Sequence, residues 1–108
     1  MTRESPAWLR AEREYRDRLP DRCTVPELFE DSAARHVDRP AQQYKGGVYD
    51  RSLVATGVVP AAEPGEFATL TYGEMRDIVR MLAAGLRELG LGAGDRVAIY
   101  ADTRMEWA

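Results

Sequence analysis

The chain has 108 residues, of which 44% are hydrophobic and 31% are charged, and its formal net charge is -3 at pH 7. That length allows one domain, and the hydrophobic content suits a modest core and is too high for a disordered tail. The negative charge argues against nucleic acid as a partner, and the single cysteine, Cys23, excludes an internal disulfide or a cysteine metal cluster.

The first predicted element is a charged helix that runs to about Arg18, with Ser5 as its N-cap and Pro6 in its first helical position. Opposite charges four residues apart support it: Arg10 with Glu14, Glu12 with Arg16, and Arg13 with Asp17. Its apolar stripe is thin: Trp8, Ala11, Tyr15 and Leu19. Such a helix either binds a membrane surface or a partner, or lies in solvent against its own protein. The alternating charges favour the second interpretation.

The N-terminal residues lack the apolar run of a secretory signal, and no stretch of about 18 apolar residues could span a membrane. We therefore expect a cytoplasmic protein, with peripheral membrane association left open.

A second helix is predicted from Thr24 to about His36, because Thr24 and Glu27 have the spacing of a capping box. A turn at 38–40 and a strand at 41–44 follow. Gly46-Gly47 then predicts a hairpin turn into a returning strand at 48–49. Residues 50–66, rich in proline and glycine, indicate a loop of variable length, and a strand is expected at 67–70.

The clearest element is the next helix, for which Thr71 and Glu74 form another predicted capping box. Apolar residues recur at helical spacing: Met75, Ile78, Val79, Leu82, Ala83, Leu86 and Leu89. Gly90 stands where a left-handed residue ends a helix. A turn at 91–95, a buried strand at 97–101 and a new helix capped by Asp102 or Thr103 complete an α/β pattern.

Several residues could suggest a binding site, but each has a simpler interpretation. His36 is the only histidine, so we interpret it as a helix-end residue. The glycines after Lys45 follow the lysine, whereas a phosphate loop has them before it. The glycine-rich stretch at 90–94 leaves a helix and enters a strand, the reverse of a dinucleotide loop. Asp102 and Thr103 are better explained as helix caps. We therefore assign no catalytic, cofactor-binding or metal-binding residue.

In order and spacing, several short motifs together resemble the start of the adenylate-forming acyl-CoA synthetase family. They are LTYGE at 70–74, LAAGL at 82–86, LG at 89–90, GDRVAI at 94–99 and TVPEL at 24–28. The ending DTRMEW at 102–107 is similar to the branch of long-chain fatty-acid–CoA ligases. The resemblance implies a fold that begins the large AMP-binding domain. Residues 1–23 would then be a charged helix and linker, and residues 24–108 a truncated start of that domain.

The resemblance also implies an activity for the full-length enzyme: a fatty acid, ATP and coenzyme A give acyl-CoA, AMP and diphosphate through an acyl-adenylate, with Mg²⁺ as cofactor. Its phosphate loop, its acidic Mg²⁺ ligand and its charge-stabilising lysine match no position here. We therefore expect this segment to be inactive and to bind none of these ligands. The alternative is a stand-alone, non-catalytic α/β interaction or regulatory module.

Overall fold

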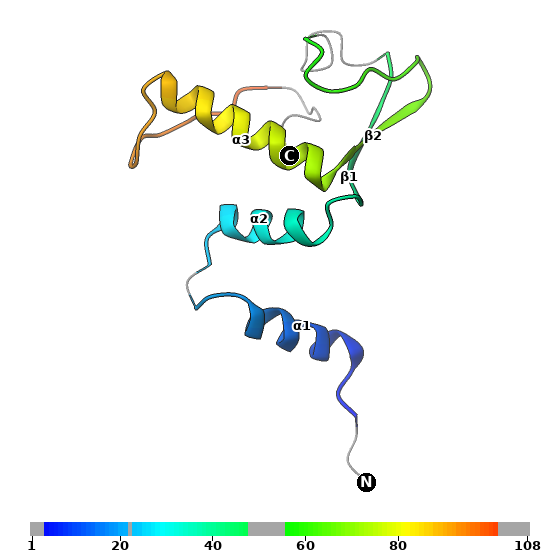
Figure 1. Ribbon diagram of the computed structural model, residues 1–108, viewed down its shortest axis with the longest axis vertical. Helices are drawn as coiled ribbons and strands as arrows, with labels where there is room; N and C mark the ends of the chain where they lie inside the picture. The colour runs from blue at the N-terminus through cyan, green and yellow to red at the C-terminus, as the bar shows by residue number, and fades with distance from the viewer. Residues whose placement is uncertain (1–3, 22, 48–55, 102–108) are drawn as a thin grey trace. The chain divides into compact units, whose positions relative to one another are not determined.

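The computed structural model describes residues 4–21, 23–47 and 56–101 (Figure 1). Within these residues, three helices and two strands follow the order α1, α2, β1, β2, α3. This small set of helices with a two-stranded sheet confirms the predicted α/β class. The chain divides into two compact units, Met1–Ser32 and Ala33–Ala108.

In the first unit, α1 spans Ala7–Arg18, as the sequence predicted, but its cap was assigned one residue too early. Pro6 is the N-cap, because its ψ of 148° is extended and the helical conformation starts at Ala7. Of the three expected ion pairs on this helix, the structure shows Glu12 with Arg16, at 2.6 Å. Both side chains are well exposed, so the pair adds little stability.

Helix α2 spans Val25–Arg35 and begins with the predicted capping box. The Thr24 amide donates to the Glu27 carboxylate at 2.8 Å, and the Glu27 amide donates to the Thr24 hydroxyl at 3.3 Å. Arg18 lies over the Tyr15 ring and pairs with Asp31 at 3.1 Å, which joins the end of α1 to α2 within this unit.

In the second unit, β1 (Pro40–Lys45) pairs antiparallel with β2 (Phe67–Thr71), and both strands were predicted. Their pairing with each other was not predicted. The Gly46 amide donates to the Glu66 carbonyl at 2.8 Å, so Gly46 continues the pairing with the chain before β2. The expected returning strand at 48–49 lies outside the described residues.

The core of this unit is a cluster of Tyr44, Val59 and Leu70, against which Ala68 and Ile78 pack. Tyr44 and Leu70 come from the two strands, as alternation along a strand predicts. Val59 comes from the stretch that the sequence indicated as a loop. The part of that loop at 56–66 is therefore attached to the sheet by an apolar anchor.

Helix α3 spans Tyr72–Glu88 and follows β2 without a break, and both hydrogen bonds of its predicted capping box are present. Its first turn is held to the chain before β1, because the Gly73 amide donates to the Val37 carbonyl at 3.0 Å. None of the residues of α3 is fully buried. Most of the predicted apolar stripe is open to solvent in the described structure, with Leu82 59% and Leu89 84% exposed.

The strand predicted at 97–101 is absent from the described structure, where residues 96–101 form no helix or strand. Val97 and Ile99 are 63% and 69% exposed, and Tyr100 is fully exposed. A strand exists only when a neighbouring strand satisfies its amides and carbonyls, and no described segment occupies that place. The helix expected after it lies outside the described residues. No described helix is long and apolar enough to cross a membrane.

Candidate functional site

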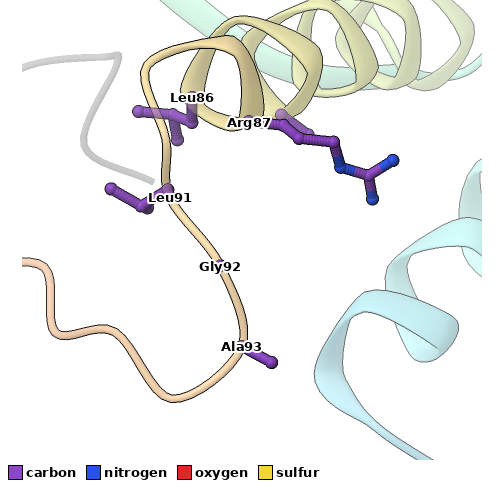
Figure 2. Close-up of a pocket in the computed structure, with 6 residues that line it drawn as sticks. Leu86, Arg87, Leu91, Gly92 and Ala93 are labelled. Atoms are coloured by element: carbon purple, nitrogen blue, oxygen red, sulfur yellow. The ribbon is translucent and has the colours of Figure 1, made fainter.

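The described part of the chain has a depression of about 360 Å³ at the C-terminal end of α3. Helix α3 and the turn that follows it line this depression: Ala83, Leu86, Arg87, Leu91, Gly92 and Ala93. Figure 2 shows Leu86 and Leu91 extending to the same side, with the guanidinium of Arg87 pointing away from them. The walls are therefore mainly apolar, with one cation at the edge.

A helix stop of the Schellman type builds the upper part of this depression. The Leu91 amide donates to the Leu86 carbonyl at 3.1 Å, and the Gly90 amide donates to the Arg87 carbonyl at 3.0 Å. Gly90 has a φ of 96°, in the left-handed region that this stop requires. The predicted role of Gly90 is thus confirmed. Leu86 and Leu91, which both line the depression, stand at the two positions where apolar side chains usually accompany such a stop.

A tight turn over residues 92–95 builds the lower part. The Asp95 amide donates to the Gly92 carbonyl at 3.1 Å, and Gly94 has a φ of 86°, as in the third position of a type II turn. The Asp95 carboxylate accepts from the Gly92 amide at 2.6 Å. Because an internal carboxylate already occupies that amide, a phosphate would meet a negative charge here. The structure agrees with a turn and not with a dinucleotide loop.

The chemistry of this depression is limited. Its lining has no nucleophile and no carboxylate, and Arg87 is its one ionisable side chain. Leu, Ala and Gly can only supply apolar contact. We conclude that the depression is a surface that another apolar group could cover.

The structure also describes other residues that the sequence analysis considered as candidates for a binding site. His36 follows the end of α2, with its ring centroid 6.1 Å from that of Tyr72. Lys45 is exposed at the end of β1. A Cβ atom on Gly46 would lie 2.2 Å from the Glu63 carbonyl oxygen, so a glycine is needed there for the close passage of the backbone. Asp102 and Thr103 lie outside the described residues.

Tyr44 is the one ionisable residue in the core cluster, and its hydroxyl donates to the Pro60 carbonyl. Burial raises the pKa of the Tyr44 phenol above its usual value, and the negative charge of Glu74 raises it further. A phenol with a raised pKa stays neutral near pH 7, so Tyr44 acts as a hydrogen-bond donor that holds the 56–66 segment. Sequence patterns missed this contact; two adjacent valines, Val58 and Val59, inside a loop rich in proline and glycine were the available signal.

The described residues do not fit a nucleotide with its metal. No group of three or more His, Cys, Asp or Glu side chains in them could hold a metal ion. The two acidic side chains at helix starts, Glu27 and Glu74, are engaged in capping boxes with Thr24 and Thr71. Those boxes also use the helix amides that an anion would need. We therefore derive no reaction step through ATP or Mg²⁺ from these residues.

Comparison with known proteins places this piece of α/β structure. Residues 29–108 match the family described as AMP-binding enzyme. Because this match spans most of the sequence, the chain belongs to the AMP-binding enzyme family. No solved structure gives a significant match to it.

Curated relatives have short but clear similarity to the chain. It is 45% identical over 56 residues to an acetyl-coenzyme A synthetase of Pseudoalteromonas atlantica, over 47% of this chain and 9% of the relative. It is 46% identical over 44 residues to a long-chain-fatty-acid–CoA ligase of Mycobacterium tuberculosis, over 41% of this chain and 7% of the relative. It is 31% identical over 88 residues to surfactin synthase subunit 1 of Bacillus subtilis, over 82% of this chain and 2% of the relative.

The chain thus spans less than a tenth of the length of each of these relatives. The relatives include an acetyl-CoA synthetase and a long-chain ligase at nearly equal identity. The family assignment is therefore firm, while the long-chain subtype suggested by the sequence is not singled out by the relatives.

Proposed function

We propose that the chain is the N-terminal segment of an ATP-dependent acyl-CoA synthetase, in which it builds the start of the AMP-binding domain. The reaction of the whole enzyme would join a carboxylic acid to coenzyme A through an acyl-adenylate. The family match over residues 29–108 carries this proposal. The relatives named as acetyl-CoA synthetase and long-chain-fatty-acid–CoA ligase support the choice of coenzyme A as acceptor.

Within this proposal, the acid is a long-chain fatty acid. The support is the sequence DTRMEW at 102–107, which is similar to the branch of long-chain fatty-acid–CoA ligases. ATP, Mg²⁺ and coenzyme A would bind residues beyond those described here, because the described residues supply no metal ligand set. We assign this segment a structural role and expect no activity from it alone.

The test has two stages. First, the coding DNA on both sides of this stretch is read; a continuous frame that encodes a Ser/Thr/Gly-rich phosphate loop is expected. Second, the product of that frame is assayed for diphosphate release with ATP and either palmitate or acetate, with and without coenzyme A. We expect release with palmitate. Release with acetate alone would overturn the long-chain assignment, and no release with any acid would overturn the ligase assignment.

The 108-residue chain is the matched control in the same assay. We expect no diphosphate release from it. Release would show that the segment carries catalytic residues, and it would contradict the structural role. A stop codon after Ala108, together with a soluble monomeric product, would instead favour the interaction module.

For location, we propose the cytoplasm, with peripheral membrane contact through α1. The support is Trp8, which is 66% exposed on that helix. Alternating charges on α1 oppose strong binding, so we expect weak co-sedimentation with anionic phospholipid vesicles and its loss on Trp8→Ala. The substitution Leu19→Ala, near the end of the same helix, should have a smaller effect. Equal sedimentation of the wild-type and Trp8→Ala chains would contradict the contact.

A further inference from the structure

Residues 56–66, the 56–66 segment, dock onto the β1–β2 pair through one buried side chain. Val59 is 2% exposed and belongs to the core cluster, whereas its neighbour Val58 is 40% exposed. The other residues of the segment are exposed or half-buried. The Tyr44 hydroxyl donates to the carbonyl of Pro60, the residue directly after Val59. Docking of the segment therefore depends on a short stretch that packs and hydrogen-bonds against Tyr44.

The start of α3 contacts the same core cluster. Ile78, in the second turn of this helix, packs against the cluster, and most of the half-buried residues of α3 lie at 72–78. The pKa of the Tyr44 phenol is raised by burial and, to a smaller extent, by the negative charge of Glu74, so the first turn of α3 also lies near this tyrosine. The 56–66 segment and the start of α3 therefore have Tyr44 as a common neighbour.

We propose that docking of the 56–66 segment holds the first two turns of α3 in place through the core cluster. Without Val59, the side chains of Tyr44 and Leu70 would face a void or water, and the surface on which Ile78 packs would loosen. A segment with one buried side chain opens at a lower free energy than the unit to which it belongs. Lifting the segment off the cluster would therefore loosen the start of α3. This coupling lies within the second unit and is independent of the ligase activity.

The first experiment is amide hydrogen exchange of the 108-residue chain with Val59→Ala, and with Val58→Ala as the matched control. The Gly46 amide, which donates to the Glu66 carbonyl, reports on docking of the segment. Val59→Ala should speed exchange by about tenfold or more at this amide and at the amides of 74–78. Val58→Ala, the same truncation one residue earlier, should leave both rates unchanged.

The amides at 85–88 are the internal reference for this experiment. They lie about two turns beyond Ile78 in the same helix. Loosening at the start of α3 should leave their exchange rates near the wild-type values. Equal acceleration along the whole of α3 would instead mean that Val59→Ala unfolds the second unit as a whole.

Tyr44→Phe is the milder variant, because it removes the hydrogen bond to Pro60 and keeps the aromatic ring in the cluster. The loss of one such bond should speed exchange at the Gly46 amide by about fivefold. The amides at 74–78 should also exchange faster, by a smaller factor, and those at 85–88 should not change. Circular dichroism should show wild-type helix content, which separates this local opening from unfolding.

The reverse experiment starts from the helix, because a coupling between two parts of a protein acts in both directions. Ile78→Ala should speed exchange at the Gly46 amide, although Gly46 lies outside α3. Val79→Ala is the control, since Val79 is the next residue of the helix and is 40% exposed. It should leave the Gly46 amide at its wild-type rate.

Three results would overturn the proposal. The first is faster exchange at Gly46 in Val59→Ala with wild-type rates at 74–78. The second is an equal effect of Val58→Ala and Val59→Ala, or no effect of Ile78→Ala at Gly46. The third applies if Val59→Ala unfolds the unit as a whole: Tyr44→Phe then decides, and equal acceleration at 74–78 and 85–88 in that variant would exclude a specific link to the start of α3.

Discussion

At the scale of single residues, two glycines of the second unit differ in the space that they leave for a side chain. A Cβ atom on Gly46 would be 2.2 Å from the Glu63 carbonyl oxygen and 2.3 Å from that of Ala62. A Cβ atom on Gly85, inside α3, would meet nothing within 4 Å. Substitution to alanine should therefore change the stability in opposite directions at these two positions.

We expect Gly46→Ala to destabilise the β1–β2 pair by about 1–3 kcal/mol, because the backbone of the 56–66 segment must move away. Gly85→Ala should stabilise α3 by about 0.5–1 kcal/mol, because alanine has less backbone freedom to lose. Amide hydrogen exchange in β1 and α3 measures both. A neutral Gly46→Ala would show that the close passage at Ala62 and Glu63 is not required.

Tyr44 predicts a pH dependence at the same scale. Its folded-state pKa is raised by burial and by Glu74, so the unfolded chain loses the phenolic proton first as the pH rises. The contribution of Tyr44 to stability is therefore full below about pH 10 and is lost as the pH rises toward the folded-state pKa. In Tyr44→Phe this loss should disappear, and stability above pH 10 should fall less steeply.

The measurement is urea unfolding at a series of pH values, followed by circular dichroism. Tyr100→Phe is the control, because Tyr100 is fully exposed. At neutral pH, Tyr44→Phe should cost about 1 kcal/mol through the lost bond to the Pro60 carbonyl. Identical pH profiles for the wild-type and Tyr44→Phe chains would show that Tyr44 does not carry the dependence.

At the scale of elements, the capping boxes explain why α2 and α3 begin where they do. In α3 the Thr71 amide donates to the Glu74 carboxylate at 2.8 Å, and the Glu74 amide donates to the Thr71 hydroxyl at 3.2 Å. This helix is partly exposed along its length, so its own local interactions matter more than usual.

Thr71→Ala should destabilise α3 by about 1 kcal/mol, because an amide at the helix start loses its acceptor. The faster amide exchange should be confined to α3, whereas Thr24→Ala should affect α2 in the same way. Glu74→Gln keeps a side chain that can complete the box and should cost less. Unchanged exchange in α3 after Thr71→Ala would mean that tertiary contacts alone hold its first turn.

At the scale of the whole molecule, the exposed apolar surface predicts marginal stability. Leu82, Leu89, Val97 and Ile99 are each more than half exposed. Burying such side chains stabilises a protein by roughly 1.5–3 kcal/mol each, and ordering the backbone of a helix costs about 1–2 kcal/mol per residue. Because most of the apolar stripe of α3 is exposed, the free energy gained by burying apolar side chains is too small to offset the cost of ordering the helix backbone.

We therefore expect the 108-residue chain to unfold broadly on heating, or to associate, when followed by calorimetry and light scattering. Leu82→Glu and Leu89→Glu should raise its solubility, because they remove apolar surface without removing a buried contact. A sharp, reversible unfolding transition of a monomer would contradict this prediction.

The sequence by itself determined what depends on neighbours within about four positions. Thr24 with Glu27, Thr71 with Glu74, and Gly90 after an apolar stripe set the starts and ends of helices, since capping and helix stops are local hydrogen bonds. The same short patterns led correctly to the AMP-binding family. The absence of assigned site residues stays a prediction.

Only the tertiary structure decided which distant segments meet. It paired β1 with β2, placed Val59 in the core and brought the Tyr44 hydroxyl to Pro60. The prediction of a strand at 97–101 was wrong because strand formation depends on a partner that is distant in sequence. No described segment provides such a partner. Local patterns state what a residue favours, and long-range pairing decides whether that preference is realised.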